Sequence, residues 1–321
     1  MERWEIASTF YEANYRSLVQ CFLKGGEIAT LGGTRAHTCR FCGRTSPKVT
    51  FRKRAHAFPE STGNKSLLTN YECDTCNSLF GEGIEDHFGK WSAPTRALSQ
   101  VRGKNGVPTL KKTGGGWRVE LGNTGLEIQH YIDEPIVQID ASRKRVTISI
   151  PRQPFIPLAV FKTFVKMAIS IMPESELAFF QDTIKWIRNR NHSAPFMSSG
   201  LILFDTFVPG PLPFSEISAF LFRRKTEALP VPYMTFMIAY GNDCYQIFVP
   251  CPPKDRTLPA SVSLCHFPTP YDLKPSHYGI PQRAVVELGG REAVKGELAE
   301  MTMHFDRVEE ILRDAKGPEK P

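Results

Sequence analysis

The sequence lacks any run of 18 or more apolar residues, which excludes a membrane-spanning helix by the usual length criterion. Its first residues carry early acids and no apolar signal core, so we expect no export and a cytoplasmic location. Internal repeats and low-complexity tracts are also lacking. With 41% hydrophobic and 23% charged residues, the composition is that of ordinary globular protein. The 321 residues exceed what one compact core usually needs, so we expect two domains.

The chain has eight cysteines, and in a reducing compartment they are not expected to form a disulfide framework. Four of them are scattered and are interpreted as buried or inert thiols: Cys21, Cys244, Cys251 and Cys265. The other four form two C-x-x-C pairs, Cys39/Cys42 and Cys73/Cys76, separated by 30 residues. Because two thiolates spaced in this way can reach one ion, and four complete a tetrahedral shell, the pairs predict a structural Zn²⁺ site.

Basic residues are concentrated between Arg35 and Lys65, where eight of them accompany a single acid, Glu60. The formal charge of the whole chain is +7, so the remainder is close to neutral. Such a local excess suits a phosphate backbone, although a solvated loop face is the alternative interpretation.

Apolar periodicity and turn residues predict a mixed α+β chain. The helix at 157–171 begins with proline and is followed by Pro173, and Ser175 is expected to cap the helix after it. The predicted helices are 2–23, 157–171, 175–188 and 291–314, and the predicted strands are 117–121, 126–128, 136–139, 146–150, 201–208, 217–222, 234–240, 245–249 and 261–265.

The residues between and around the cysteine pairs are more specific than the pairs alone. His56 is followed by Pro59, and Asn77 directly follows the last cysteine. The stretch CRFCGRTSPKVTFRKRAHAFPESTGNKSLLTNYECDTCNSLFG resembles the HNH endonuclease family, with its ββα-metal fold. The resemblance covers residues 39 to about 90, and it implies a strand bearing a histidine, a second strand, and a helix beginning at the second C-x-x-C.

The resemblance implies roles for individual residues. His56 matches the family's first histidine and would be the general base, since an imidazole titrates near working pH. Asn77 matches the last position, which binds the catalytic Mg²⁺ or Mn²⁺; a helix cap is its alternative role. For the middle asparagine, which would orient the histidine or the loop, Asn70 is preferred and Asn64 is the alternative. Arg52, Lys53 and Arg54 would contact the DNA backbone.

One departure from the family pattern concerns the catalytic ion. Many members carry Asp or Glu directly before the first histidine, and this chain has Ala55 there. Mg²⁺ usually takes at least one carboxylate, so another side chain is expected to substitute. The candidates are Glu60, Glu85, Asp86 and, for a softer ion, His87.

Residues 117–321 contain no glycine-rich phosphate loop, nucleophile elbow or second metal-binding cluster in their sequence. We interpret them as an accessory domain with a mostly antiparallel sheet, serving recognition, regulation or homo-oligomerisation. The resulting organisation is a helical extension at 1–34, an HNH zinc module at 35–91, a linker at 92–116 and the accessory α+β domain at 117–321.

Two functions remain open at the level of sequence. The first is a metal-dependent DNA endonuclease, by analogy with bacterial restriction or phage defence. The second is a zinc-containing nucleic-acid-binding or interaction protein whose nuclease site has decayed, as Ala55 suggests.

Overall fold

The computed structural model describes residues 3–33, 38–123, 125–130, 135–194, 196, 200–259 and 261–307. The fold is mixed α+β, as predicted. Its helices are α1 (Arg3–Asn14), α2 (Asp74–Gly81), α3 (Ile84–Leu98), α4 (Pro157–Ile171), α5 (Glu174–Leu177), α6 (Gln181–Arg188), α7 (Pro252–Asp255) and α8 (Pro270–Leu273), with short 3₁₀ turns at Glu60–Thr62 and Ala178–Phe180.

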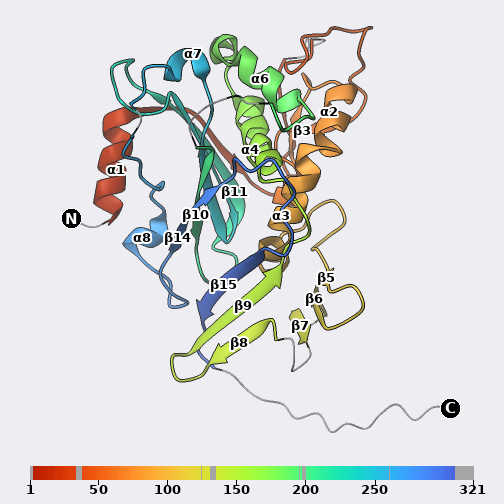
Figure 1. Ribbon diagram of the computed structural model, residues 1–321, viewed down its shortest axis with the longest axis vertical. Helices are drawn as coiled ribbons and strands as arrows, with labels where there is room; N and C mark the ends of the chain where they lie inside the picture. Colours follow the sequence, from red (N-terminus) through yellow and green to blue (C-terminus); the bar gives the residue numbers. More distant parts are fainter. Residues whose placement is uncertain are drawn as a thin grey trace, which may run out of the picture.

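The largest sheet has six strands in the order β1-β11-β12-β13-β10-β14, and every neighbouring pair is antiparallel. Helix α4 lies against one face, while α1 and α8 lie on the opposite side (Figure 1). The strands are β1 (Tyr15–Leu23), β10 (Ile202–Phe207), β11 (Phe214–Arg224), β12 (Met234–Gly241), β13 (Asp243–Phe248) and β14 (Gln282–Glu287).

Helix α4 forms the centre of the molecule. All of its residues are buried, because it packs between the large sheet and helix α3. Pro157 stands in its first turn, where a missing N–H costs no hydrogen bond, and Pro173 follows its end. The predicted bounds of this helix are confirmed.

The cysteine pairs flank a small ββα unit. Strands β3 (Ala55–His56) and β4 (Leu67–Thr69) pair antiparallel, and β2 (Ala29–Leu31) joins β4 in parallel. Helix α2 starts directly after Cys73, so the strand, loop, strand and helix order expected from the resemblance is confirmed.

Two further three-stranded sheets complete the chain. One contains β5 (Leu110–Lys111), β6 (Trp117–Leu121) and β7 (Leu126–His130), and the other contains β8 (Val137–Asp140), β9 (Arg145–Pro151) and β15 (Leu298–His304). Across the described residues, none of the helices is long and apolar enough to cross a membrane.

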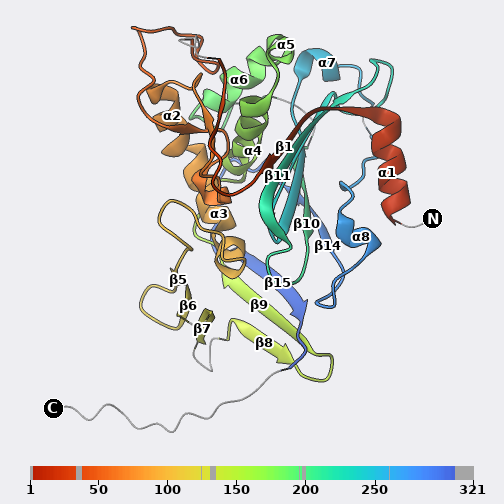
Figure 2. The same ribbon diagram turned by 180° about the vertical axis from the view of Figure 1, so that it is seen from behind.

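The prediction of one helix over 2–23 is wrong in its second half. The helix ends at Asn14, and Tyr15–Leu23 forms edge strand β1, which pairs with β11 along its length (Figure 2). The partner lies some 200 residues away in the chain, from Ile217 to Arg224, so local periodicity does not reveal it.

Three other local predictions are also wrong. The described part of 291–314 contains no helix: Leu298–His304 pairs with β9, which buries Ala299 and Met301; residues 308–314 lie outside the described residues. Residues 261–265 form no strand, and the Cys265 carbonyl instead accepts hydrogen bonds from the Tyr11 and Gln246 side chains. Ser175 caps nothing, since α5 begins after Pro173.

The zinc module and the large sheet share one hydrophobic core. Phe88 packs edge-on against Phe164 of α4, and Trp91 contacts both Phe164 and Tyr245 of β13. Helix α3 itself continues to Leu98, through the first seven residues of the predicted linker 92–116. The division of the chain into functional domains stays a prediction, but the two parts are joined by a continuous core.

Candidate functional site

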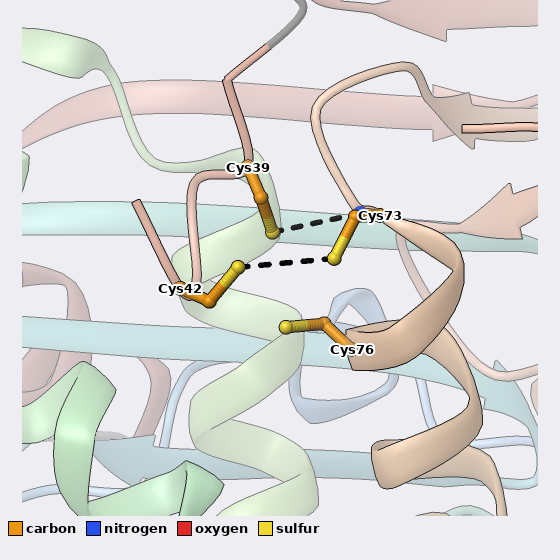
Figure 3. A group of neighbouring side chains, drawn as sticks. All are labelled: Cys39, Cys42, Cys73 and Cys76. Carbon is orange, nitrogen blue, oxygen red and sulfur yellow. Dashed lines mark hydrogen bonds between the residues drawn. The ribbon is translucent and has the colours of Figure 1, made fainter. Parts of the chain in front are cut away.

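The four cysteines of the two pairs converge on one point (Figure 3). Their sulfur atoms all lie within 4.8 Å of one another, and the Cys42 and Cys73 sulfurs are 3.8 Å apart. This distance is far too long for a disulfide. It matches the edge of a tetrahedron of sulfurs around Zn²⁺, which is about 3.8 Å for Zn–S bonds of about 2.3 Å. The predicted residues therefore form a group that can hold a structural zinc ion.

Backbone donors support the thiolates of this cluster. The Cys73 N–H points at the Cys39 sulfur, with a separation of 3.5 Å. A hydrogen bond from Cys76, with backbone N–H groups beside it, lowers the pKa of Cys39 to about 4. A thiolate that forms this readily is suited to metal binding.

Arg40, inside the first cysteine pair, connects the cluster to α4. Its guanidinium nitrogen Nη1 lies 2.8–3.1 Å from the carbonyl oxygens of Ile169, Ser170 and Met172, which end the helix. The ring of Tyr71 stacks 3.9 Å below the guanidinium, and its hydroxyl donates to the Ser170 carbonyl. A cation at a helix C-terminus satisfies carbonyls that lack helical partners and interacts favourably with the helix dipole.

His56 lies at the end of β3, opposite Leu68 of β4, and its side chain is half-buried. It is not part of the cysteine cluster. Among the described residues we find no hydrogen bond to its imidazole. Burial lowers the pKa of His56 below its ordinary value, with Arg54 and Lys166 acting in the same direction and Glu60 and Glu85 opposing them. The imidazole is therefore neutral near pH 7 and free to accept a proton.

A buried ammonium group supports the strand that carries His56. Lys166 of α4, which is about 1% exposed, donates to the His56 carbonyl at 2.9 Å. The same nitrogen lies 3.2 Å from the Glu72 carboxylate and 3.1 Å from that of Glu85. Burial raises the pKa of Glu72 to about 7, whereas the two carboxylates raise the pKa of Lys166 above its ordinary value. The cluster is thus a lysine cation shared by two acids.

The two candidate middle asparagines have different structural roles. Asn64 is buried and makes four hydrogen bonds, donating to the Phe58 and Leu67 carbonyls and accepting from the Ser66 and Leu67 N–H groups. It therefore holds the turn between β3 and β4. Asn70 donates to the carbonyls of Gly32 and Gly33, and among the described residues no hydrogen bond joins it to His56. Of the two roles considered for Asn70, its contacts fit the orienting of a loop.

Asn77 lies in the first turns of α2, and its backbone N–H makes a helical bond to the Cys73 carbonyl. The N-cap position belongs to Cys73, so the alternative capping role of Asn77 is excluded. Its side chain is partly exposed and forms no hydrogen bond with the described residues. An amide without a protein partner is available to a ligand.

The basic residues Arg52, Lys53 and Arg54 are exposed on the loop that precedes β3. Asp74 of α2 fixes this loop, because its carboxylate accepts from the Arg52 and Lys53 backbone N–H groups at 2.9 and 2.8 Å. The Lys53 ammonium also donates to Ser78 at 2.7 Å. The loop is therefore held against helix α2, which begins at the second cysteine pair.

The candidate substitutes for the missing carboxylate are placed differently. Glu60 and Glu85 lie close enough to raise the pKa of His56. Asp86 pairs with Lys90 one turn further along α3, at 2.6 Å. His87 has its Nδ1 occupied by the Ile156 N–H at 3.2 Å, where α3 meets the start of α4. The environment of His56 thus favours Glu60 and Glu85.

Sequence reasoning missed Arg40, Glu72, Asp74 and Lys166. Asp74 carried a local signal, because an acid in the first turn of a helix is stabilised there. Lys166 stood within an apolar helical stripe, where a cation that is not exposed needs a partner. Nothing local pointed to Glu72 as that partner.

The comparison with protein families agrees with this geometry. Residues 39–92 match the family model described as HNH endonuclease. The match spans the cysteine cluster, β3, β4, α2 and the first half of α3, and it confirms the resemblance seen in the sequence. No curated protein and no solved structure matches the chain. The segment thus carries an HNH endonuclease-type module with a cysteine cluster able to bind metal, and such a module implies a nucleic-acid substrate.

Proposed function

We propose that this protein is a metal-dependent endonuclease that hydrolyses DNA phosphodiester bonds, with His56 as its general base. One observation carries the proposal. The imidazole of His56 is half-buried, has a lowered pKa, and has no hydrogen-bond partner among the described residues, whereas its backbone is held by β4 and by Lys166.

His56 acts on the attacking water. Its neutral imidazole takes a proton from the water while the water oxygen bonds to phosphorus and the bond from phosphorus to the 3′ oxygen breaks. The leaving oxygen gains a proton from solvent, and the products carry a 5′-phosphate and a 3′-hydroxyl. A positioned general base contributes roughly 10²–10⁴-fold to such a rate.

The side chains that we propose for the catalytic ion carry oxygen donors, which suit a hard divalent ion. The amide oxygen of Asn77 is unpaired among the described side chains, and Glu60 lies within electrostatic reach of His56, as does Glu85. Mg²⁺ and Mn²⁺ take oxygen ligands of this kind. Asn77 with Glu60 would hold the ion, and His87 is the weaker candidate because one of its ring nitrogens is occupied. When bound, such an ion neutralises charge on the phosphate and the leaving oxygen.

Substrate contact is assigned to the loop of Arg52, Lys53 and Arg54. Their side chains are exposed just before the strand of His56, and Asp74 holds the loop through the backbone N–H groups of Arg52 and Lys53. Contacts to phosphates position a strand without reading its sequence, so the module alone cuts with little sequence preference. Asn70 supports the neighbouring loop through Gly32 and Gly33.

The setting we propose is the cytoplasm, where the cysteines stay reduced. There the large sheet would regulate the module, recognise the target, or join a second copy of the chain. A role in restriction or phage defence rests on analogy with other HNH modules fused to accessory domains. Infection of cells that express the wild type or His56→Ala tests that role: only the wild type lowers plaque numbers.

A second candidate function has one observation in its favour. Ala55 is about 1% exposed and stands where many HNH family members have a carboxylate, which would suit a DNA-binding protein with a decayed site.

Plasmid nicking separates the two functions. Zinc-loaded protein is incubated with supercoiled plasmid and Mg²⁺ or Mn²⁺, and the DNA ends are analysed. We expect nicked and linear DNA with 5′-phosphate ends. Binding without cleavage under either ion supports the second function.

A further inference from the structure

A small pocket opens where α2 meets α3, on the side that faces the end of α6. Its volume is about 220 Å³. The polar residues that line it come from two segments: Glu82 and His87 from the α2–α3 region, and Arg188, Asn189, Arg190 and His192 from the last residue of α6 and the chain beyond it. Neither the cysteine cluster nor His56 is part of the lining.

Both histidines of the pocket present N–H donors. The Nδ1 atom of His87 accepts the Ile156 N–H at 3.2 Å, so the proton of its neutral ring is on Nε2. The Nδ1 atom of His192 lies 3.2 Å from the Lys162 ammonium, which can only donate, and the same assignment follows. Burial, with Lys162 and His87 adding to it, lowers the pKa of His192 to about 4, so this ring is neutral at pH 7.

Behind His192 is a buried cation without an acidic partner. Lys162 of α4 is fully buried, and its ammonium donates to the Asn189 carbonyl at 2.9 Å as well as contacting His192. Among the described residues no carboxylate pairs with it, and burial lowers its pKa to about 8. The Nε atom of Arg188, which lines the pocket, is also buried and has no partner in the described chain.

Each acidic residue in or near the pocket has a cationic neighbour. Glu85 pairs with Lys166, Asp86 pairs with Lys90, and the exposed Glu82 lies 3.8 Å from Arg190. The pocket also includes Gly83 and Ile84, where α3 begins and no side chain caps its first turn. Donors and positive charge therefore exceed acceptors and negative charge at this point.

From this arrangement we propose that the pocket binds a phosphate group, held by Arg188, the Nε2 atoms of His87 and His192, and the positive field of Lys162. A tetrahedral oxyanion accepts several hydrogen bonds. It also supplies the negative partner that Lys162 and Arg188 lack among the described residues. The first turn of α3 adds to the attraction. This site is separate from the proposed nuclease site and does not depend on cleavage.

Calorimetric titration of the full-length, zinc-loaded protein tests the proposal, with inorganic phosphate as the probe and no Mg²⁺ or Mn²⁺ added. Wild type is compared with Lys162→Met, Arg188→Met and the control Lys185→Met. Lys185 lies on α6 with its side chain 74% exposed and pairs with Asp182. We expect saturable binding by the wild type and the control, and at least tenfold weaker binding by the other two variants. Thermal midpoints and zinc content establish that each variant is folded.

Two further arms identify the source of the phosphate. If the group belongs to DNA, a short duplex binds more tightly than inorganic phosphate. Excess phosphate then weakens binding of the duplex to the wild type but not to Arg188→Met. If it belongs to a free metabolite, a 5′-mononucleotide competes with phosphate and the duplex does not. Failure of the wild type to bind phosphate saturably overturns the proposal, as does equal binding by all four proteins. Binding of Zn²⁺ by His87 and His192 in place of phosphate overturns it too.

Discussion

At the residue scale, the environment of His56 determines how it can act. Its imidazole is partly removed from water and lies close to both cationic and acidic side chains. Burial is the largest of these influences and favours the neutral ring. A base that stays neutral below the usual range of histidine remains competent in mildly acidic solution.

The pH dependence of cleavage follows from this shift. A general base works only when it is deprotonated, so lowering its pKa moves the acidic limb of the rate profile to lower pH. We expect the midpoint of that limb in single-turnover cleavage to lie below pH 6.5, the ordinary value for histidine. A midpoint above that value contradicts the assignment of His56 as the base in this environment.

Asn77 gives a second prediction at this scale. Because its amide neither caps α2 nor bonds to any described residue, its loss removes a ligand and not a structural contact. Asn77→Ala should lower the cleavage rate roughly 10–100-fold. Its unfolding free energy should stay within about 0.5 kcal/mol of wild type. Asn77→His, which supplies another metal ligand, should recover much of the rate. A large loss of stability in Asn77→Ala counts against a ligand role.

At the scale of elements, α4 supports the zinc module from two sides. Arg40 of the first cysteine pair binds the carbonyls that end α4, and Lys166 of α4 reaches back to the strand of His56. The helix therefore contacts both the cysteine cluster's first pair, through Arg40, and the strand of the proposed base. Lys166 is a positioning residue, since it contacts the His56 backbone and not the reacting atoms.

Removing the Lys166 cation leaves two carboxylates buried. Lys166→Met should cost about 3–5 kcal/mol of unfolding free energy, the range for breaking a buried ion pair on one side. The double variant Lys166→Met/Glu72→Gln should recover part of this loss, because it removes one uncompensated charge. Chemical denaturation measures both. If the second substitution makes the protein still less stable, the ion cluster is not the source of the effect.

Local elements were predictable from the sequence where the signal was itself local. The prolines around α4 marked its ends, and the spacing of the cysteine pairs marked the metal cluster and the start of α2. Strand β1 was missed because its stabilising partner is β11, far away in the chain. Lys166 and His56 are 110 residues apart, and Arg40 and Ile169 are 129 apart, so no pattern within a window could join them.

At the scale of the whole molecule, the zinc module and the large sheet share one hydrophobic core, so we expect them to unfold together. Phe88 packs against Phe164 of α4, and Trp91 packs against Tyr245 of the large sheet. All four side chains belong to one hydrophobic cluster. The exposed loop of Arg52–Arg54 stands outside this core. The accessory region is thus part of the structure that holds the module together.

Zinc removal tests this unity. Structural zinc contributes about 10–16 kcal/mol of apparent folding free energy in small modules, which equals or exceeds the total stability of about 5–15 kcal/mol of typical proteins. A chelator should therefore lower the thermal midpoint of the entire chain in a single transition. Circular dichroism and calorimetry follow the change. Two separate transitions, with the large sheet unaffected, would show that the module folds independently.

The most direct test of the nuclease account is the single-turnover cleavage rate of His56→Ala against a matched histidine variant. His277→Ala is the control, since His277 is exposed and lies outside the module. All proteins are loaded with zinc, and their metal content and thermal midpoints are compared before plasmid, Mg²⁺ or Mn²⁺ is added. The account predicts a loss of roughly 10²–10⁴-fold for His56→Ala with unchanged zinc content, and wild-type rates for His277→Ala. Equal cleavage by His56→Ala and wild type would contradict it.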